Sequence, residues 1–273
     1  MASVTFSEVM SRVPLRMFQI FTFVVCAIVL IADGVDAQLL GVVTPLILKD
    51  YGVDRGTFGV AVSAALVGFG LGSWGGGWLG DKIGRRWSLT LAAVVFSLGT
   101  VAASTANGVT EMAIWRLLGG LGFGSAYANA IALTGEWLPD RWRSVAVTTI
   151  SVGTPLGGSV VGALAPTTVE LWGWRGSFVC FGIATFLLCV VLIIAVLRDS
   201  PAFLLARGKK AEAQQAARRV LNEDLDLIVE RHMTDVGETS IGVLHASNLR
   251  LNIGIGIAFT SAALVAYGVL NWM

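Results

Sequence analysis

Two aspartates stand inside an apolar stretch near the start of the chain. Asp33 and Asp36 lie within residues 18–44, which are otherwise almost wholly apolar. A spacing of three residues places both carboxylates on one face of a helix. Each would cost about 2.5–3.5 kcal/mol at the centre of a membrane-spanning helix, so neither should face lipid. The pair predicts a proton or substrate site in a water-filled cavity. The other interpretation is that the helix ends near Asp33 and both acids lie in an outer loop.

A single arginine lies in a second apolar block. Arg116 opens the glycine-rich run RLLGGLGFG near the start of residues 112–134, roughly one and a half helical turns from the outer end. That depth matches the depth of the two aspartates. An arginine there needs an acidic partner, a bound anion or water. Because arginine stays charged while aspartate can titrate, the three groups would couple anion binding to protonation. The alternative is that Arg116 extends to the outer headgroups.

A third cluster of charges lies in a short segment between two apolar blocks. The segment GWLGDKIGRR contains Gly77, Gly80, Asp81, Lys82, Gly84, Arg85 and Arg86. Its glycines predict a tight turn at the membrane surface, and its charges stand where they can pair with helix ends. A generic turn rich in positive charge would account for the basic residues. It would not account for the aspartate together with the spaced glycines.

The chain that carries these residues is strongly apolar. Of its 273 residues, 55% are hydrophobic and 14% are charged, against about 25% charged in an ordinary soluble domain. This balance excludes a disordered chain, and the net charge of +1 offers no footprint for nucleic acid. The cysteines Cys26, Cys180 and Cys189 show no metal or disulfide spacing, so we expect them to pack as small apolar residues. The composition predicts an all-α, polytopic membrane protein.

Seven apolar blocks are long enough to cross a bilayer. They cover residues 18–44, 58–79, 87–106, 112–134, 145–167, 176–197 and 251–273. With the N-terminus in the cytoplasm, 15 of the 19 lysines and arginines lie on the cytoplasmic side and 3 lie outside. This bias predicts a multi-pass protein of the inner (plasma) membrane with a cytoplasmic N-terminus.

The blocks divide the chain into three parts. Residues 1–197 should form a six-helix bundle, residues 198–250 a cytoplasmic linker, and residues 251–273 the first helix of a second bundle. Within the linker, residues 202–221 are either a short interfacial helix or a solvated segment with some helix. We expect His232 and His245 to be solvated there. Since two-part transporters repeat a six-helix unit, the sequence looks like a truncated chain that lacks its C-terminal half.

The charged segment carries a resemblance to a known family. Residues 77–86 resemble the signature loop of the major facilitator superfamily. Asp33 and Asp36, together with residues 116–144, resemble the aromatic acid/proton symporter branch more closely. The segment Asp199-Ser-Pro201 is similar to the proline-containing segment after the sixth span in sugar and organic-anion carriers. It departs from that pattern at Asp199 and at Ala202, where Glu and Arg are common.

The resemblance implies a six-helix N-terminal bundle plus a seventh helix, and proton-coupled uptake of an aromatic or other small organic acid by alternating access. It implies no enzymatic activity and no cofactor, because the proton gradient drives transport. The expected partners are the organic anion, the proton, the lipid bilayer and a C-terminal half.

The resemblance also implies roles for individual residues. Asp33 and Asp36 would be the coupling and substrate-site acids, and Arg116 would hold the substrate. The segment of residues 77–86 would act in the cytoplasmic gate, with Glu136 and Arg143 as nearby partners. Asp81 would then have no partner, because in the family it meets a helix of the second half.

Other functions remain open. The same fold also serves sugar or metabolite carriers and drug exporters, and a chain of this length could be a fragment that transports nothing. The acidic pair with Arg116 suits an anion better than a neutral sugar. The sequence lacks a phosphate-binding G-x-x-x-x-G-K-[ST] loop, and it lacks the H-E-x-x-H and G-x-S-x-G motifs of hydrolases. Trp74 and Trp78, inside the second block, either pack or line a cavity.

Overall fold

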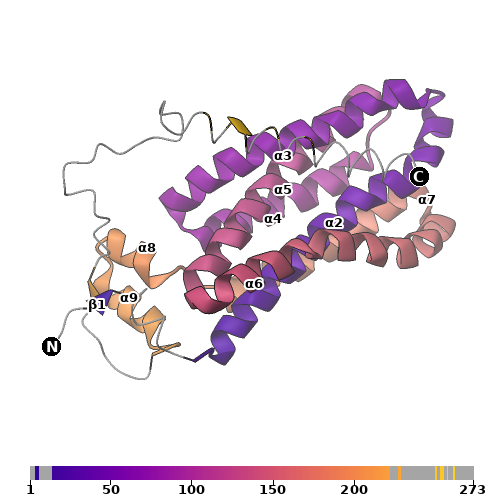
Figure 1. The fold of residues 1–273 in the computed structure, drawn as a ribbon. Helices are drawn as coiled ribbons and strands as arrows, with labels where there is room; N and C mark the ends of the chain where they lie inside the picture. Colours follow the sequence, from indigo (N-terminus) through magenta and orange to yellow (C-terminus); the bar gives the residue numbers. More distant parts are fainter. Residues whose placement is uncertain are drawn as a thin grey trace. The chain divides into compact units, whose positions relative to one another are not determined.

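The computed structural model of the protein describes residues 4–5, 14–221 and 227–228, with helical residues at 250, 253–254, 257 and 261. The chain divides into two units, Met1–Val229 and Glu230–Met273. Long helices make up most of the described part of the first unit (Figure 1). Most of the expected seventh span and both histidines lie outside the described residues, so the expectations for them stay predictions.

The helices follow the apolar blocks closely over the first half of the chain. The first four are α2 (Met17–Tyr51), α3 (Arg55–Ile83), α4 (Arg85–Ala103) and α5 (Val109–Trp137). They are followed by α6 (Asp140–Ser151), α7 (Gly153–Val196), α8 (Pro201–Ala206) and α9 (Lys210–Ala217). The two-residue strands β1 (Val4–Thr5) and β2 (Leu227–Ile228) pair in parallel. Within the described residues, five stretches are long and apolar enough to cross a membrane, the last being Asp140–Val196.

The fifth and sixth blocks are arranged differently from the prediction. The block 145–167 is not one helix, because α6 ends at Ser151 and α7 begins at Gly153. The expected division between the fifth and sixth blocks is nevertheless present, because the range of α7 comprises two helices that meet at a kink. Its one non-helical residue is Gly173, with φ 66° and ψ −175°, a conformation that glycine adopts without a steric penalty. A kink at one residue therefore serves as the short connection between the fifth and sixth spans.

Glycines set how closely the helices pack, and this places α5 at the centre of the bundle. Helix α5 contacts α2, α3, α4 and α6. A Cβ atom on Gly72 of α3 would overlap the backbone of Leu121 in α5, and one on Gly124 of α5 would overlap the backbone of Phe69 in α3. The glycines after Arg116 therefore act in packing, and they bring the helix that carries Arg116 against its neighbours.

A second close contact joins α2 and α7 next to the two aspartates. A Cβ atom on Gly34 would overlap the carbonyl of Thr154, and one on Gly157 would overlap the carbonyl of Ile31. Gly34 is helical, so it serves close approach rather than local unwinding. The contact brings Thr154 beside Asp33.

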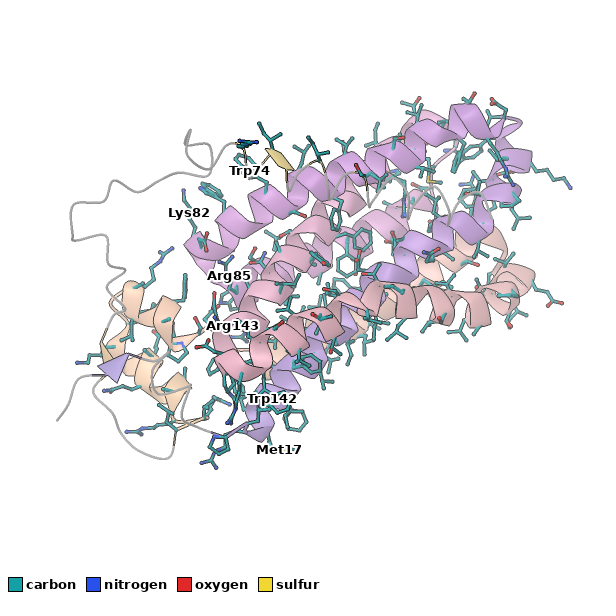
Figure 2. All side chains as sticks on the ribbon, in the orientation of Figure 1. Met17, Trp74, Lys82, Arg85, Trp142 and Arg143 are labelled. Carbon is teal, nitrogen blue, oxygen red and sulfur yellow. The ribbon has the colours of Figure 1, made fainter. Side chains whose placement is uncertain are left out.

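The segment after α7 is neither a single helix nor a solvated linker. Ser200 caps α8 by accepting a hydrogen bond from the amide of Phe203 at 3.3 Å, and Pro201 occupies its first turn. Gly208, with a φ of 73°, separates α8 from α9. Leu204 and Ala213 are buried in the same apolar cluster as residues of α2, α4 and α5. Both short helices thus pack on the bundle, at the end where Figure 2 labels Lys82, Arg85 and Arg143.

Candidate functional site

A buried ion pair joins α2 to α5. Arg116 donates from Nη1 to Asp36 Oδ2 at 2.8 Å and from Nη2 to Asp36 Oδ1 at 3.2 Å. The side chains are 3% and 4% exposed. Two parallel bonds between a guanidinium and a carboxylate fix both orientation and distance. The expected meeting of Asp36 and Arg116 therefore occurs, and Arg116 does not extend to the surface.

Helices α4 and α7 complete the surroundings of this pair. The Thr100 hydroxyl lies 2.6 Å from Asp36 Oδ1 and 2.9 Å from the carbonyl oxygen of Phe96. The Arg116 guanidinium lies 5.1 Å from the ring centroid of Phe178. Its Nε is buried and has no hydrogen-bond partner among the described residues. One donor of Arg116 thus stays unused while its other two nitrogens hold Asp36.

Asp33 has a different environment, although it shares a helix face with Asp36. It is 5% exposed and accepts a hydrogen bond from the Thr154 hydroxyl at 3.2 Å. Within residues 14–221, no basic side chain forms an ion pair with it. Helix α2 continues past both acids to Tyr51, so they do not lie in an outer loop. Asp36 and Arg116 are brought together, whereas Asp33 faces a hydroxyl of α7.

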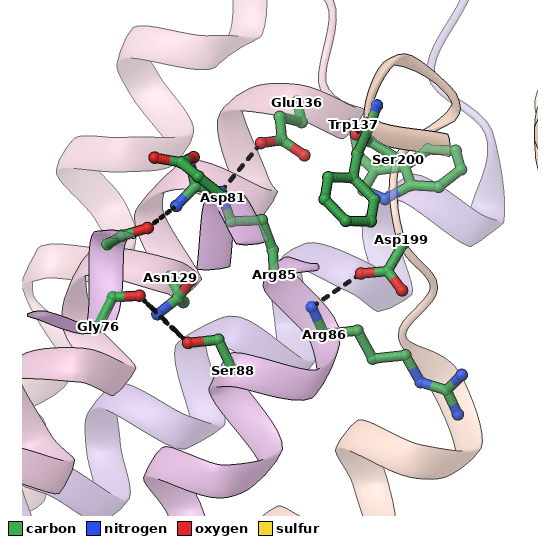
Figure 3. A network of polar contacts seen from close by, with 12 residues as sticks. Gly76, Asp81, Arg85, Arg86, Ser88, Asn129, Glu136, Trp137, Asp199 and Ser200 are labelled. Carbon is green, nitrogen blue, oxygen red and sulfur yellow. Dashed lines mark hydrogen bonds and ion pairs between the residues drawn. The ribbon is translucent and has the colours of Figure 1, made fainter. Parts of the chain in front are cut away.

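The turn between α3 and α4 is held by Arg85. Arg85 pairs with Asp81, donates from Nε to Glu136 Oε1 at 3.2 Å, and donates from Nη1 to the carbonyl of Gly77 at 3.1 Å (Figure 3). The expectation that Asp81 has no partner is therefore wrong. The reason is local, because residues four apart on a helix are neighbours. Asp81 is nevertheless 68% exposed.

The second expected partner of this turn, Arg143, forms its contacts with α5 and α6. Arg143 pairs with Asp140 at 3.0 Å and donates from Nε to the carbonyl of Gly135 at 3.0 Å. Lys82 lies 3.8 Å from the ring centroid of the exposed Trp78. Glu136 thus contacts the turn, whereas Arg143 forms its ion pair within α6. Trp74 and Trp78 are both exposed in this unit, so neither packs in its core.

Two further polar groups at this end of the bundle were not predicted as part of the site. Asp199 accepts a hydrogen bond from the amide of Arg86 at 3.1 Å, beside Gly84 with its φ of 100° (Figure 3). Burial raises the pKa of the Asp199 carboxyl, and the Arg86 amide opposes that shift. Asn129 of α5 donates to the carbonyl of Gly76 and to the Ser88 hydroxyl, both at 2.9 Å. The sequence singled out Asp199 only as a departure from the family's segment after the sixth span, and Asn129 only as a polar residue within an apolar block.

Helices of membrane-spanning length that enclose a buried ion pair are typical of a multi-pass membrane protein. The sequence profile described as Major Facilitator Superfamily matches residues 26–273. The chain belongs to the major facilitator superfamily, a family of transporters and not of enzymes.

Curated relatives of this chain have been named for aromatic acids. It is 31% identical to the 4-hydroxybenzoate transporter PcaK of Acinetobacter baylyi, over 81% of this chain and 49% of the relative. It is 32% identical to the gallate transporter of Pseudomonas putida, over 75% of this chain and 45% of the relative. The chain therefore spans about half the length of the curated relatives it matches.

A solved structure confirms the fold. The proton:xylose symporter XylE of E. coli matches with a TM-score of 0.66 and 23% identity, covering 75% of this chain and 50% of that chain. The predicted major-facilitator bundle is thus confirmed for this half of the fold.

Proposed function

We propose that this chain forms the N-terminal half of a carrier that takes up aromatic or other small organic acids together with protons. The observation that carries the proposal is the buried, bidentate pair of Arg116 and Asp36. The names of the relatives, 4-hydroxybenzoate transporter and gallate transporter, supply the aromatic carboxylate. A second six-helix half would complete the cavity, and transport would follow the rocking of the two halves.

Arg116 would be the substrate-binding residue, because the Asp36 carboxylate already occupies it in the geometry that a substrate carboxylate needs. A proton taken up by Asp36 would weaken the bond to Arg116. The substrate carboxylate would then replace Asp36 on the guanidinium. Return of the proton to the other side would restore the ion pair and release the substrate.

Asp33 would be the second proton-coupling acid. Its partner is the Thr154 hydroxyl, which can donate to a carboxylate or accept from a carboxylic acid. Asp33 can therefore gain or lose a proton without breaking a buried ion pair. The contact with α7 through Gly34 would pass this change to the helix.

The turn of residues 77–86 would form the cytoplasmic gate, with Arg85 and Glu136 as its central pair. This assignment places the N-terminus in the cytoplasm and the protein in the inner membrane, as the distribution of basic residues indicates. The proton gradient would supply the energy, so the carrier would need no cofactor.

Uptake of labelled 4-hydroxybenzoate into proteoliposomes, with and without an inward proton gradient, tests the proposal. The chain is measured alone and extended by the second half of a relative, with xylose as a neutral control substrate. Asp33→Asn and Asp36→Asn should each abolish gradient-driven accumulation by the extended chain. Asp50→Asn is the matched control, because Asp50 lies on α2 but pairs with Arg175 at the exposed end.

Three outcomes would overturn parts of the proposal. Normal accumulation by both Asp33→Asn and Asp36→Asn would refute the coupling role of the acids. Robust accumulation by the chain alone would refute the need for a second half. Xylose uptake equal to that of the carboxylate would refute the substrate class.

A further inference from the structure

Two arginines converge on one carbonyl oxygen where α7 ends. Arg86, in the first turn of α4, donates from Nη2 to the carbonyl of Ile194 at 2.8 Å. Arg198, just after α7, donates from Nη1 to the same carbonyl at 3.1 Å. The two guanidinium nitrogens are therefore separated by no more than two hydrogen-bond lengths. Two like charges held this closely repel each other, which raises the question of what anion offsets them.

A third arginine adds to this positive charge. Burial lowers the pKa of the Arg198 guanidinium, and the nearby charges of Arg86 and Arg219 lower it further. Across the described parts of the chain, none of these three arginines forms an ion pair with a carboxylate. Asp199 is the acid that faces Arg86, and it accepts a hydrogen bond from the Arg86 amide rather than from the guanidinium. Lys209 and Glu212 also act on Asp199 and carry opposite charges, so positive charge stays in excess around the three arginines.

Exposed apolar side chains begin directly beside the arginines. On α4, Trp87, Leu91 and Leu98 are exposed, and the Arg86 guanidinium lies 5.0 Å from the ring centroid of Trp87. On α7, Ile183, Leu187, Val191 and Ile194 are exposed at helical spacing. Helices α4 and α7 pack against each other. A ligand that suits this surface has an anionic head and an apolar tail.

We propose that Arg86 and Arg198 bind the headgroup phosphate of an anionic phospholipid, whose acyl chains lie along the exposed stripes of α4 and α7. Arg219 adds attraction for the charge of the headgroup. A free phosphate would use the arginines but would leave the apolar stripes without a role. The tryptophan next to Arg86 suits the same boundary, because tryptophan concentrates at the interface of membrane and water. This inference does not depend on the proposed transport activity.

Native mass spectrometry of the full chain, titrated with phosphatidylglycerol or phosphatidylcholine in detergent, tests the proposal. Wild type should bind phosphatidylglycerol more tightly than phosphatidylcholine. Arg198→Gln should weaken phosphatidylglycerol binding about fivefold, the factor expected for one basic residue near an anionic lipid surface. Arg219→Gln provides a second variant that touches no carbonyl of α7, should Arg198→Gln fail to fold. Arg55 is an exposed arginine at the first residue of α3. Arg55→Gln is the matched control and should not change the binding of phosphatidylglycerol.

Soluble glycerol phosphate separates a lipid site from a free-phosphate site. It should not compete with phosphatidylglycerol, and its competition at equal concentration would overturn the assignment to a lipid. Equal binding of the two lipids by wild type would also overturn the proposal. So would binding of phosphatidylglycerol by folded Arg198→Gln and Arg219→Gln at the wild-type level.

Discussion

Replacement of Asp36 by asparagine should destabilise the bundle strongly. Asparagine keeps nearly the same volume but leaves the buried Arg116 guanidinium without its counter-charge. Among the residues the structure describes, no other carboxylate pairs with Arg116. Removing one partner of a buried ion pair typically costs 3–5 kcal/mol, so the free energy of unfolding should fall by about 3–5 kcal/mol.

Two further variants show whether this loss comes from the isolated charge. Asp81→Asn removes an acid from a pair whose aspartate is largely exposed, so it should cost no more than about 1 kcal/mol. The double variant Asp36→Asn/Arg116→Gln removes both buried charges. It should be more stable than Asp36→Asn alone, because a neutral pair does not leave a charge without solvent or a partner.

The measurement is the free energy of unfolding of wild type, Asp36→Asn, Arg116→Gln, the double variant and Asp81→Asn in detergent micelles, from denaturant titrations followed by tryptophan fluorescence. A double-mutant cycle then isolates the interaction of Asp36 with Arg116. The reasoning is refuted if Asp36→Asn is no less stable than Asp81→Asn. It is also refuted if the losses of the two single variants simply add in the double variant.

Three more predictions concern packing, pH and polar contacts. Gly34→Ala should lower the free energy of unfolding by about 1–3 kcal/mol, because the added Cβ would overlap the backbone of α7. Gly41→Ala, whose added Cβ would meet open space, should not lower it, and equal thermal midpoints of the two variants would contradict this prediction. Burial raises the pKa of Asp199 in the folded protein. The contribution of this carboxyl to the stability of the folded protein is therefore complete below the ordinary aspartate pKa near 4, and it is lost as the pH rises through the raised pKa. The midpoint of wild type should therefore fall relative to that of Asp199→Asn as the pH rises from about 4, and a constant difference would argue against it. Asn129→Ala should cost about 1–3 kcal/mol by removing its buried hydrogen bonds to the Gly76 carbonyl and the Ser88 hydroxyl, and a loss no greater than that of the exposed Asn107→Ala would disprove that role.

Much of the bundle could be predicted from the sequence. The first four apolar blocks each became one helix, because a run of apolar residues long enough to cross a bilayer satisfies its backbone only as a helix. The pairing of Asp36 with Arg116 followed from opposite charge at similar depth. Both predictions rest on the high cost of polar groups in hydrocarbon, which leaves few arrangements open.

The partners of the acids could not be predicted in the same way. Thr100 and Thr154 contact Asp36 and Asp33, yet a threonine in a helix commonly bonds its own backbone, as Thr44 does to the carbonyl of Leu40. Hydroxyls therefore give no signal in the sequence. The kink at Gly173 was hidden for a similar reason, since Gly173 is one of 33 glycines and nothing in the sequence distinguishes it from those that serve packing.

The length of α2 has a consequence for the depth of the ion pair. Its 35 residues extend about 52 Å, whereas the hydrocarbon layer of a bilayer is about 30 Å thick. The helix must tilt or project beyond the hydrocarbon layer. If it projects equally on both sides, its middle residue, Gly34, lies at the bilayer centre. A thinner bilayer would then increase the tilt of α2 about a pivot flanked by Asp33 and Asp36. The two carboxylates would keep their depth while the helix ends swing.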